Sequence, residues 1–288
     1  MGFRLANVAG RAVLVHGEHF TDLATHSSGM FGPDPMEALT RPDLLSELSA
    51  TLDDATVTGL LADVTLGPPV PRPQKVFGIG LNYLDHVAEG GREVPSSPLV
   101  FTKFPSCLVG PTADVEIRSA GCDYEAELVV VIGEGGRDIA IADAWNHVVG
   151  VTVGQDISDR PAQFAASPPH FDLGKSFDTF GPIGPFLVST DNLADRDALP
   201  IRCAVNGEVR QNGSTADLIF DVPTLISFLS GVTTLVPGDL IFTGTPAGVG
   251  AAKGHYLADG DVITTTIEGV GTMTNRVVRI SDPLPLGG

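Results

Sequence analysis

The sequence predicts an α+β fold dominated by β-strands, with a small α/β domain at the N-terminus. After residue 75, short runs rich in Val, Ile, Leu, Phe and Thr are separated by Gly, Pro and Asp, the pattern of short strands joined by turns. Helical segments are few and do not alternate strictly with strands, so a doubly wound parallel sheet is not expected. The expected strands are 75–79, 99–102, 127–132, 148–153, 184–188, 201–205, 240–242, 261–267 and 273–280, and the expected helices are 83–88, 160–166 and 222–230.

The first part of the chain differs from the rest in its pattern of apolar and polar residues. Residues 3–8 and 11–16 alternate between polar and apolar side chains like two strands around a turn. Spaced leucines between 35 and 62 indicate one or two short helices, and the Pro-rich stretch 68–73 forms a stiff connector. We therefore divide the chain into an N-terminal domain, 1–70, and a main domain, 71–288. Nothing in the first indicates chemistry.

Two local motifs refine these elements. Asn206-Gly207 lies between strand-forming residues and is a strong signal for a β-hairpin. Pro223 suits the first turn of the expected helix 222–230, where its missing N–H is not needed.

Composition excludes several classes of function. The formal net charge of −18 argues against binding to nucleic acid or to an anionic membrane surface, and its simplest explanation is solubility. Cys107, Cys122 and Cys203 form no CxxC pair, which is typical of a reducing compartment. No apolar run has the length of a membrane span, and the N-terminus lacks a signal-peptide pattern, so we expect a cytoplasmic protein.

Acidic residues at the start of one expected strand predict a metal site. Glu125 and Glu127 precede a run of apolar residues, and alternate residues of a strand point to the same face. Two carboxylates this close repel each other unless positive charge lies between them, and Mg²⁺, Mn²⁺ or Ca²⁺ would provide it. Asp156, at the end of the expected strand 148–153, could supply a third ligand. The alternative is a solvated strand end.

Lys175 is a candidate for a role beside these acids because the chain has only four lysines. The sequence Gly174-Lys175-Ser176 superficially matches a phosphate-binding loop. That motif needs a glycine five residues before Gly174, where the chain has Pro169, so a phosphate loop is rejected.

Two further segments could contribute to a site. His86 and Glu89 are three residues apart, hence neighbours on one helix face, and a carboxylate beside an imidazole supports activation of a water molecule. The alternative is an ordinary surface pair. The glycine-rich turn around Thr245 could offer N–H groups and a hydroxyl to an anion, although such turns are more often only turns.

Six segments in order together resemble the fumarylacetoacetate hydrolase family. They extend from about residue 75 to near the C-terminus and read GIGLNYLDHVAE, DYEAELVVVIG, GVTVGQDISDR, LGKSFDTFGPIGP, VNGEVRQNGST and VPGDLIFTGTPAGVG. Each is weak alone, but six in register are highly specific. The sequence departs from the family pattern at 159–163, where Pro161 and an apolar continuation replace more polar residues, which leaves the substrate undetermined.

The resemblance implies a mixed β-sandwich roll, a divalent cation, usually Mg²⁺ or Mn²⁺, and a homodimer. It implies roles for nine residues, with His86 and Glu89 on a lid that orders when substrate binds. The implied metal ligands are Glu125, Glu127 and Asp156, the catalytic residues are His86, Glu89 and Lys175, and the substrate contacts are Arg160, Gln163 and Thr245.

The expected reaction is metal-dependent hydrolysis of a C–C bond in a small β-diketo or acylpyruvate-type acid, such as a fumarylacetoacetate or fumarylpyruvate-like compound. In this scheme His86 and Glu89 activate water, and positive charge stabilises the departing enolate. The alternative is decarboxylation of a 2-keto diacid or isomerisation of a 2-hydroxy-dienoate in aromatic catabolism. A third hypothesis is a non-catalytic protein that binds a metal and a keto acid.

Overall fold

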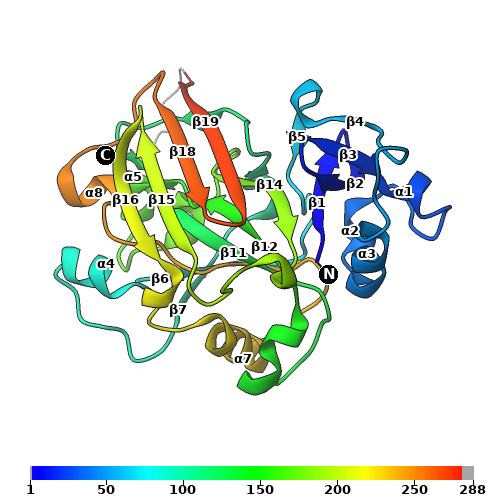
Figure 1. Ribbon diagram of the computed structural model, residues 1–288. Helices are drawn as coiled ribbons and strands as arrows, with labels where there is room; N and C mark the ends of the chain where they lie inside the picture. Colours follow the sequence, from blue (N-terminus) through cyan, green and yellow to red (C-terminus); the bar gives the residue numbers. More distant parts are fainter. Residues whose placement is uncertain (1, 281–288) are drawn as a thin grey trace.

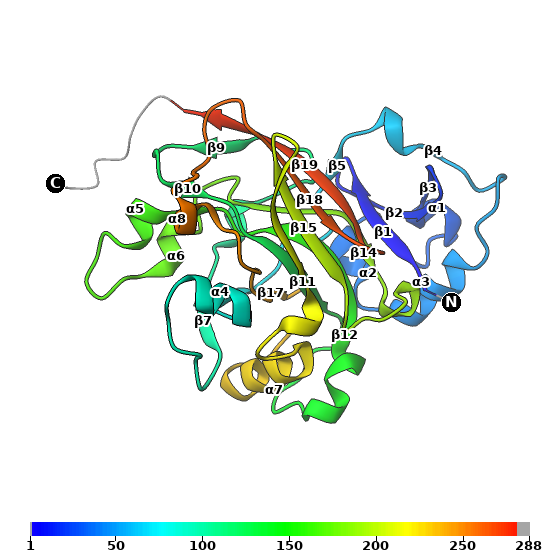
Figure 2. The ribbon, with the colours of Figure 1, turned by 60° about the vertical axis from the view of Figure 1, so that its left-hand side comes forward.

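The computed structural model describes residues 2–280, which form a large mixed sheet packed against a smaller sheet (Figures 1 and 2). The large sheet has twelve strands in the order β4-β3-β2-β1-β14-β12-β11-β17-β6-β7, with β5 added beside β1 and β8 beside β14. Its strands are β1 (Arg4–Val8), β2 (Arg11–His16), β3 (His19–Asp22), β4 (Gly59–Leu60), β5 (Leu66–Gly67), β6 (Val76–Gly80), β7 (Leu99–Thr102), β8 (Leu108–Val109), β11 (Ala126–Ile132), β12 (Val148–Gln155), β14 (Gly181–Val188) and β17 (Leu240–Phe242).

The smaller sheet has five strands and lies over β11, β12 and β14, completing a sandwich (Figure 1). Most neighbouring strands are antiparallel, whereas β17–β6, β14–β8 and β19–β9 are parallel, so the architecture is mixed as expected. In the order of the sheet, the strands are β16 (Glu208–Ser214), β15 (Pro200–Val205), β18 (Val262–Ile267), β19 (Gly271–Arg279) and β9 (Val115–Ile117), and a separate pair is β10 (Cys122–Asp123) with β13 (Ser158–Asp159).

The central strand β11 explains how the core is divided. All seven of its residues are buried, and successive side chains point to opposite faces of the sheet. Leu128, Val130 and Ile132 pack between the two sheets, whereas Val129 and Val131 pack on the other face, with residues of the N-terminal segment. A strand covered on both sides reads as a continuous apolar run, which is why this element is predictable from sequence.

The N-terminal segment extends the large sheet. Strand β1 pairs with β14 in the register Arg4↔Val188 and Leu5↔Leu187, and helices α2 and α3 lie beside this part of the sheet (Figure 1). Phe3 and Leu14 share one apolar cluster with residues of β11. The division of the chain at residue 70 stays a prediction, because the sheet and this core run across it.

The helices are short. All three predicted in the main domain are present, and α5 ends at Gln163, earlier than expected. Pro161 fits its first turn, and Asp159 caps it by accepting a hydrogen bond from the Ala162 N–H at 3.0 Å. The α-helices are α1 (Leu23–His26), α2 (Pro35–Ala38), α3 (Pro42–Ser49), α4 (Leu84–Glu89), α5 (Arg160–Gln163), α6 (Phe171–Gly174), α7 (Val222–Val232) and α8 (Gly250–Lys253), and the 3₁₀ turns are Leu61–Asp63, Pro105–Cys107, Ile141–His147, Thr190–Asn192 and Thr215–Asp217.

The two local motifs behave as expected. Asn206 and Gly207 form the turn between β15 and β16, with φ angles of 53° and 80° that suit this pair of residues. Pro223 lies in the first turn of α7, which Asp221 caps through the Thr224 N–H.

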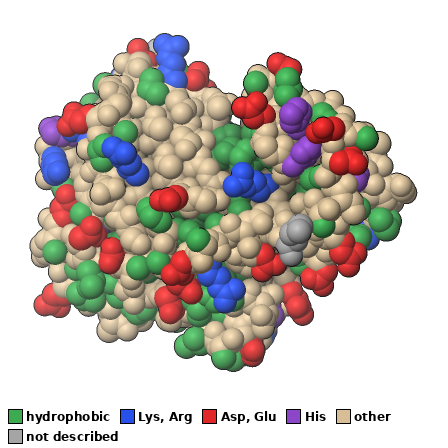
Figure 3. Space-filling view, viewed as in Figure 1, with side chains coloured by type: hydrophobic (Ala, Val, Ile, Leu, Met, Phe, Trp, Pro, Cys, Tyr) green, Lys and Arg blue, Asp and Glu red, His purple; other side chains and the backbone are tan. Residues whose placement is uncertain are grey.

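The surface matches the acidic composition. Acidic side chains are scattered over the face in Figure 3, and basic ones are fewer. Among the residues that the structure describes, no helix has the length and apolar character needed to cross a bilayer.

Candidate active site

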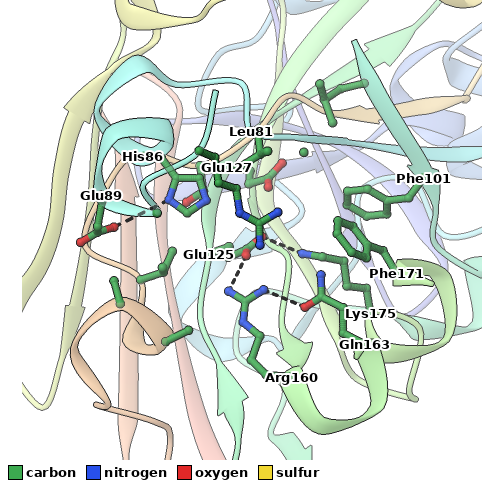
Figure 4. A pocket seen from close by; sticks show the side chains of 18 of the residues that line it. Leu81, His86, Glu89, Phe101, Glu125, Glu127, Arg160, Gln163, Phe171 and Lys175 are labelled. Atoms are coloured by element: carbon green, nitrogen blue, oxygen red, sulfur yellow. Dashed lines mark hydrogen bonds and ion pairs between the residues drawn. The ribbon is translucent and has the colours of Figure 1, made fainter. Parts of the chain in front are cut away.

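A cavity of about 340 Å³ lies where strands β6, β7 and β11 meet helices α4, α5, α6 and α8 (Figure 4). Charged groups and aromatic rings share its wall. Its lining residues are Ile79, Gly80, Leu81, His86, Glu89, Gly90, Arg92, Phe101, Glu125, Glu127, Arg160, Gln163, Phe164, Phe171, Lys175, Thr245, Val249, Ala251, Ala252 and Tyr256.

The three predicted carboxylates come together at the adjacent ends of two strands. The antiparallel pairing of β11 with β12 places Ala126 opposite Gln155, so Glu125 and Asp156 meet just beyond the ladder. Glu125, Glu127 and Asp156 are buried, and each offers an oxygen within 4.8 Å of the others. This is an all-oxygen donor set of the kind that hard divalent ions prefer.

Lys175 connects two of these acids. Its Nζ donates to Glu125 Oε2 at 2.7 Å, to Asp156 Oδ2 at 2.5 Å and to the Ser158 hydroxyl at 2.8 Å. Arg160 approaches Glu125 from the other side and donates from Nη2 to Oε1 at 2.6 Å (Figure 4). The predicted proximity of Lys175 to the acidic cluster is therefore observed, although its sequence motif gave no geometric clue.

These contacts shift the protonation of the groups involved. Burial alone would raise the pKa of Glu125, but the charges of Lys175 and Arg160 outweigh it and hold that pKa well below the usual range. Burial alone would lower the pKa of Lys175, yet the nearby Asp156 and Glu125 raise it. Both groups are held in their charged forms.

Lys103 is a part of the site that sequence reasoning missed. Its side chain is fully buried, and its Nζ donates to Asp156 Oδ1 at 2.7 Å, to the Phe180 carbonyl at 3.2 Å and to the Lys175 carbonyl. It thus holds one oxygen of Asp156, while Lys175 holds the other. The only available signal was a lysine directly after the strand 99–102 in a chain with four lysines.

Glu127 has no cationic partner among the residues described. One oxygen, Oε2, accepts the Gly244 N–H at 2.8 Å. Gly244 has φ 105°, a conformation that favours glycine. Burial first, and then the charges of Asp156 and Glu125, raise the pKa of Glu127 well above its usual value. Since a buried carboxylate without positive charge is costly, a divalent cation fits this donor set and would supply the missing charge.

The predicted His86–Glu89 pair lies on α4, and both side chains line the cavity (Figure 4). His86 Nδ1 is 3.7 Å from Glu89 Oε2, beyond hydrogen-bond length, and has no hydrogen-bond partner within the described residues. The Gly248 N–H donates to Glu89 Oε2 at 2.9 Å, which fixes the carboxylate beside the imidazole.

Arg160 and Gln163 both line the cavity and contact each other. Arg160 Nη1 donates to Gln163 Oε1 at 2.9 Å, and its Nη2 donates to Asp123 Oδ2 at 2.7 Å. Asp123 also accepts the N–H groups of Gly250 at 2.6 Å and Ala251 at 3.0 Å. Asp123, which the sequence placed beside the acidic pair without assigning it a role, anchors Arg160.

The Thr245 hydroxyl is buried at the cavity wall. It donates to the Ala126 carbonyl at 2.8 Å and accepts from Gln211 Nε2 at 2.7 Å. These bonds tie the glycine-rich turn to the start of β11, next to Glu125 and Glu127.

The profile of the family described as fumarylacetoacetate (FAA) hydrolase C-terminal matches residues 75–278. The chain belongs to this family. The match covers the large sheet from β6 onward and every candidate site residue, and it confirms both the resemblance inferred from six short segments and the β-rich α+β fold.

Similar proteins with assigned names perform different reactions. The human mitochondrial oxaloacetate tautomerase FAHD2A is 44% identical over 221 residues, which is 75% of this chain and 70% of that protein. The structure of maleylpyruvate hydrolase from Sphingobium sp. SYK-6, in complex with manganese(II) and pyruvate, is 31% identical with a TM-score of 0.81, over 96% of this chain and 100% of that one.

A third similar structure is a Mycobacterium smegmatis protein provisionally named HpcE. It is 45% identical with a TM-score of 0.90, over 96% of this chain and 100% of that one. Together with the buried carboxylate cluster, these comparisons identify a metal-dependent enzyme of the family. Hydrolases and tautomerases both stand among its relatives, so the family alone does not select the reaction.

Proposed function

We propose that this enzyme hydrolyses a C–C bond in an acylpyruvate-type acid. The observation that carries the proposal is the pair His86 and Glu89, which lines the same cavity as the cluster of Glu125, Glu127 and Asp156. Hydrolysis needs a group that takes a proton from water beside a site that binds a dioxo acid, and the cavity contains candidates for both.

The three carboxylates would hold Mg²⁺ or Mn²⁺. A divalent ion bound there would act as a Lewis acid toward the oxygens of the substrate. Lys103 and Lys175 each hold one oxygen of Asp156, so this ligand needs little reorganisation.

The residues that would transfer the proton lie on α4. His86 takes a proton from water at an imidazole nitrogen, and the negative Glu89 stabilises the imidazolium that forms. The oxygen of that water bonds to the distal carbonyl carbon, and the C–C bond to the pyruvate fragment breaks. The electron pair stays on the leaving carbon as an enolate, which then takes up a proton.

Two cationic groups lie beside the carboxylate cluster, where they would stabilise the developing enolate. The ammonium of Lys175 and the guanidinium of Arg160 both reach the carboxylate cluster from the cavity wall. Removing one such stabilising donor typically costs about 3 kcal/mol in the transition state.

The aromatic lining of the cavity favours a substrate with an acyl chain. Phe101 and Phe171 pack edge to face with ring centroids 6.0 Å apart, and Phe164 contacts Phe171 at 6.1 Å. All three rings line the cavity, where they would contact apolar carbons and exclude water.

A second candidate is the keto–enol interconversion of an oxaloacetate-type acid. The 44% identity to a human oxaloacetate tautomerase favours it. This reaction moves a proton between carbon and oxygen and needs no attacking water. Decarboxylation of such an acid would use the same enolate.

One comparison of substrates separates these reactions. The purified enzyme is loaded with Mn²⁺ and given an acylpyruvate or oxaloacetate, with ¹H NMR detection of products. We expect cleavage of the acylpyruvate to pyruvate and a carboxylic acid, its loss in Glu127→Gln and His86→Ala, and its retention in the control His147→Ala, which lies outside the cavity lining. Enolisation of oxaloacetate without any acylpyruvate cleavage would replace the first proposal by the second.

The homodimer, the cytoplasmic location and the ordering of α4 on substrate binding stay predictions. So do the individual roles of the nine residues, of which the variants above test Glu127 and His86.

A further inference from the structure

Arg92 is a cavity residue to which sequence reasoning assigned no role. It follows α4 and lines the cavity together with His86, Glu89, Arg160 and Lys175. Its backbone is fixed by hydrogen bonds at the end of the preceding helix.

The end of α4 is closed by two hydrogen bonds. The Arg92 N–H donates to the Val87 carbonyl and the Gly91 N–H to the Ala88 carbonyl, both at 3.1 Å. Gly91 has φ 60°, the left-handed conformation that this motif requires. The motif turns the chain back at Gly91 and fixes the backbone of Arg92 one residue beyond the reversal. The residue is exposed to solvent and also lines the cavity, so a ligand can reach its side chain.

The charge of Arg92 is not neutralised, in contrast with the other cavity cations. Lys175 is paired with Glu125 and Asp156, and Arg160 is paired with Glu125. No carboxylate of the described chain lies within ion-pair distance of the Arg92 guanidinium, although the molecule has a net charge of −18. Arg92 is therefore the protein cation in this cavity that remains available to a ligand.

We propose that Arg92 determines specificity by binding a second carboxylate of the substrate, distal to the 2-oxo acid end. A guanidinium offers two parallel N–H donors that match a carboxylate, and it stays charged at every relevant pH. The substrate class is thus a 2-oxo acid with a further carboxylate. This assignment deepens the proposed function and rests on it only for the identity of the reaction.

The position of Arg92 also links substrate recognition to the dyad. His86, Glu89 and Arg92 lie within seven consecutive residues, and the backbone bonds of Val87 and Ala88 join the helix to the loop. A carboxylate held by Arg92 would therefore favour the arrangement of α4 in which His86 and Glu89 face the substrate. A monoacid of the same length lacks this contact.

The test measures binding without turnover, using two acids of equal chain length. The Mn²⁺-loaded enzyme is titrated calorimetrically with 2-oxoglutarate and 2-oxopentanoate, which differ in one terminal carboxylate. We expect 2-oxoglutarate to bind roughly 10- to 100-fold more tightly, as charged hydrogen bonds allow. In Arg92→Gln this difference should disappear with little change for 2-oxopentanoate, and Arg92→Lys should restore part of it.

Arg137→Gln is the matched control, because Arg137 is exposed and paired only with Asp138, at 3.7 Å. Equal affinity of the wild type for both acids, no binding of either, or an equal loss of both in Arg92→Gln would overturn the assignment. Turnover of an acylpyruvate is measured separately. A diacid preference without C–C cleavage would leave the role of Arg92 intact and refute the proposed reaction.

Discussion

Replacing Lys103 by Met tests how the carboxylate cluster is held. The substitution keeps an unbranched apolar side chain of similar length and removes the ammonium group. It leaves Asp156 Oδ1 and the carbonyl oxygens of Phe180 and Lys175 without the donor that they share. Neither side chain of the Lys103–Asp156 pair is exposed to water, so solvent cannot replace the lost contacts.

The expected loss is large for a single substitution. Breaking a buried ion pair by removing one partner costs roughly 3–5 kcal/mol of unfolding free energy. Asp156 retains Lys175 at 2.5 Å, which favours the lower end, about 3 kcal/mol. At roughly 2–4 °C per kcal/mol for a chain of this size, Tm should fall by about 6–12 °C.

Thermal unfolding is followed by circular dichroism in EDTA, so that no metal contributes. Lys75→Met is the control, because Lys75 Nζ lies 2.7 Å from Asp239 but its side chain is 26% exposed. That substitution should cost about 1 kcal/mol, because water reaches the lysine side of the pair and the buried Asp239 keeps the N–H donors of Lys75 and Val236. A Tm change in Lys103→Met no larger than that of the control would refute the argument that burial makes this contact important.

Three further predictions concern protonation and backbone conformation. The hydrogen bonds from Arg11 lower the pKa of Asp22 in the folded protein below its usual value of 3.8. The ionised Asp22 should therefore stabilise the protein above pH 3.8, and this stability should be lost as the pH falls through the lowered pKa. A comparison of Tm against pH for the wild type and Asp22→Asn measures it. Gly248→Ala should lose roughly 1–3 kcal/mol or more of stability, because a Cβ at φ 106° would lie 2.0 Å from a backbone oxygen, whereas Gly231→Ala meets nothing within 4 Å and should not destabilise. Burial and neighbouring acids raise the pKa of Glu127, so Mn²⁺ should release a proton on binding and bind more tightly as pH rises, and a calorimetric enthalpy independent of the buffer would contradict this.

Relatives with known structures do not replace these measurements. Maleylpyruvate hydrolase binds manganese(II) and pyruvate in its crystal structure, and oxaloacetate tautomerases share more of this sequence. Related chains of this family therefore carry the names of different reactions. In our proposals, the features that select the reaction and the substrate are the α4 pair, as proton-transfer groups, and the unpaired Arg92 in the cavity lining.

The sequence was sufficient for the central strands because their signal is local. The run 128–132 is buried on both faces and contains only apolar residues, so it predicts β11 without knowledge of its partners. The shortest strands, such as β8 and β10, have two residues each and were not predicted. Such elements are defined by hydrogen bonds to distant segments, and two residues carry no periodicity.

The sequence by itself determined the family, the β-rich fold and the grouping of Glu125 with Glu127, since residues two apart on a strand share a face. Only the tertiary structure decided which charges neutralise which. Lys103, 53 residues from Asp156, reaches that carboxylate through chain folding. Glu125 is shared by Arg160 and Lys175, whereas Arg92 has no carboxylate of the described residues within ion-pair distance. Ion pairing depends on distances of a few ångströms between segments far apart in the chain, and no local pattern encodes those distances.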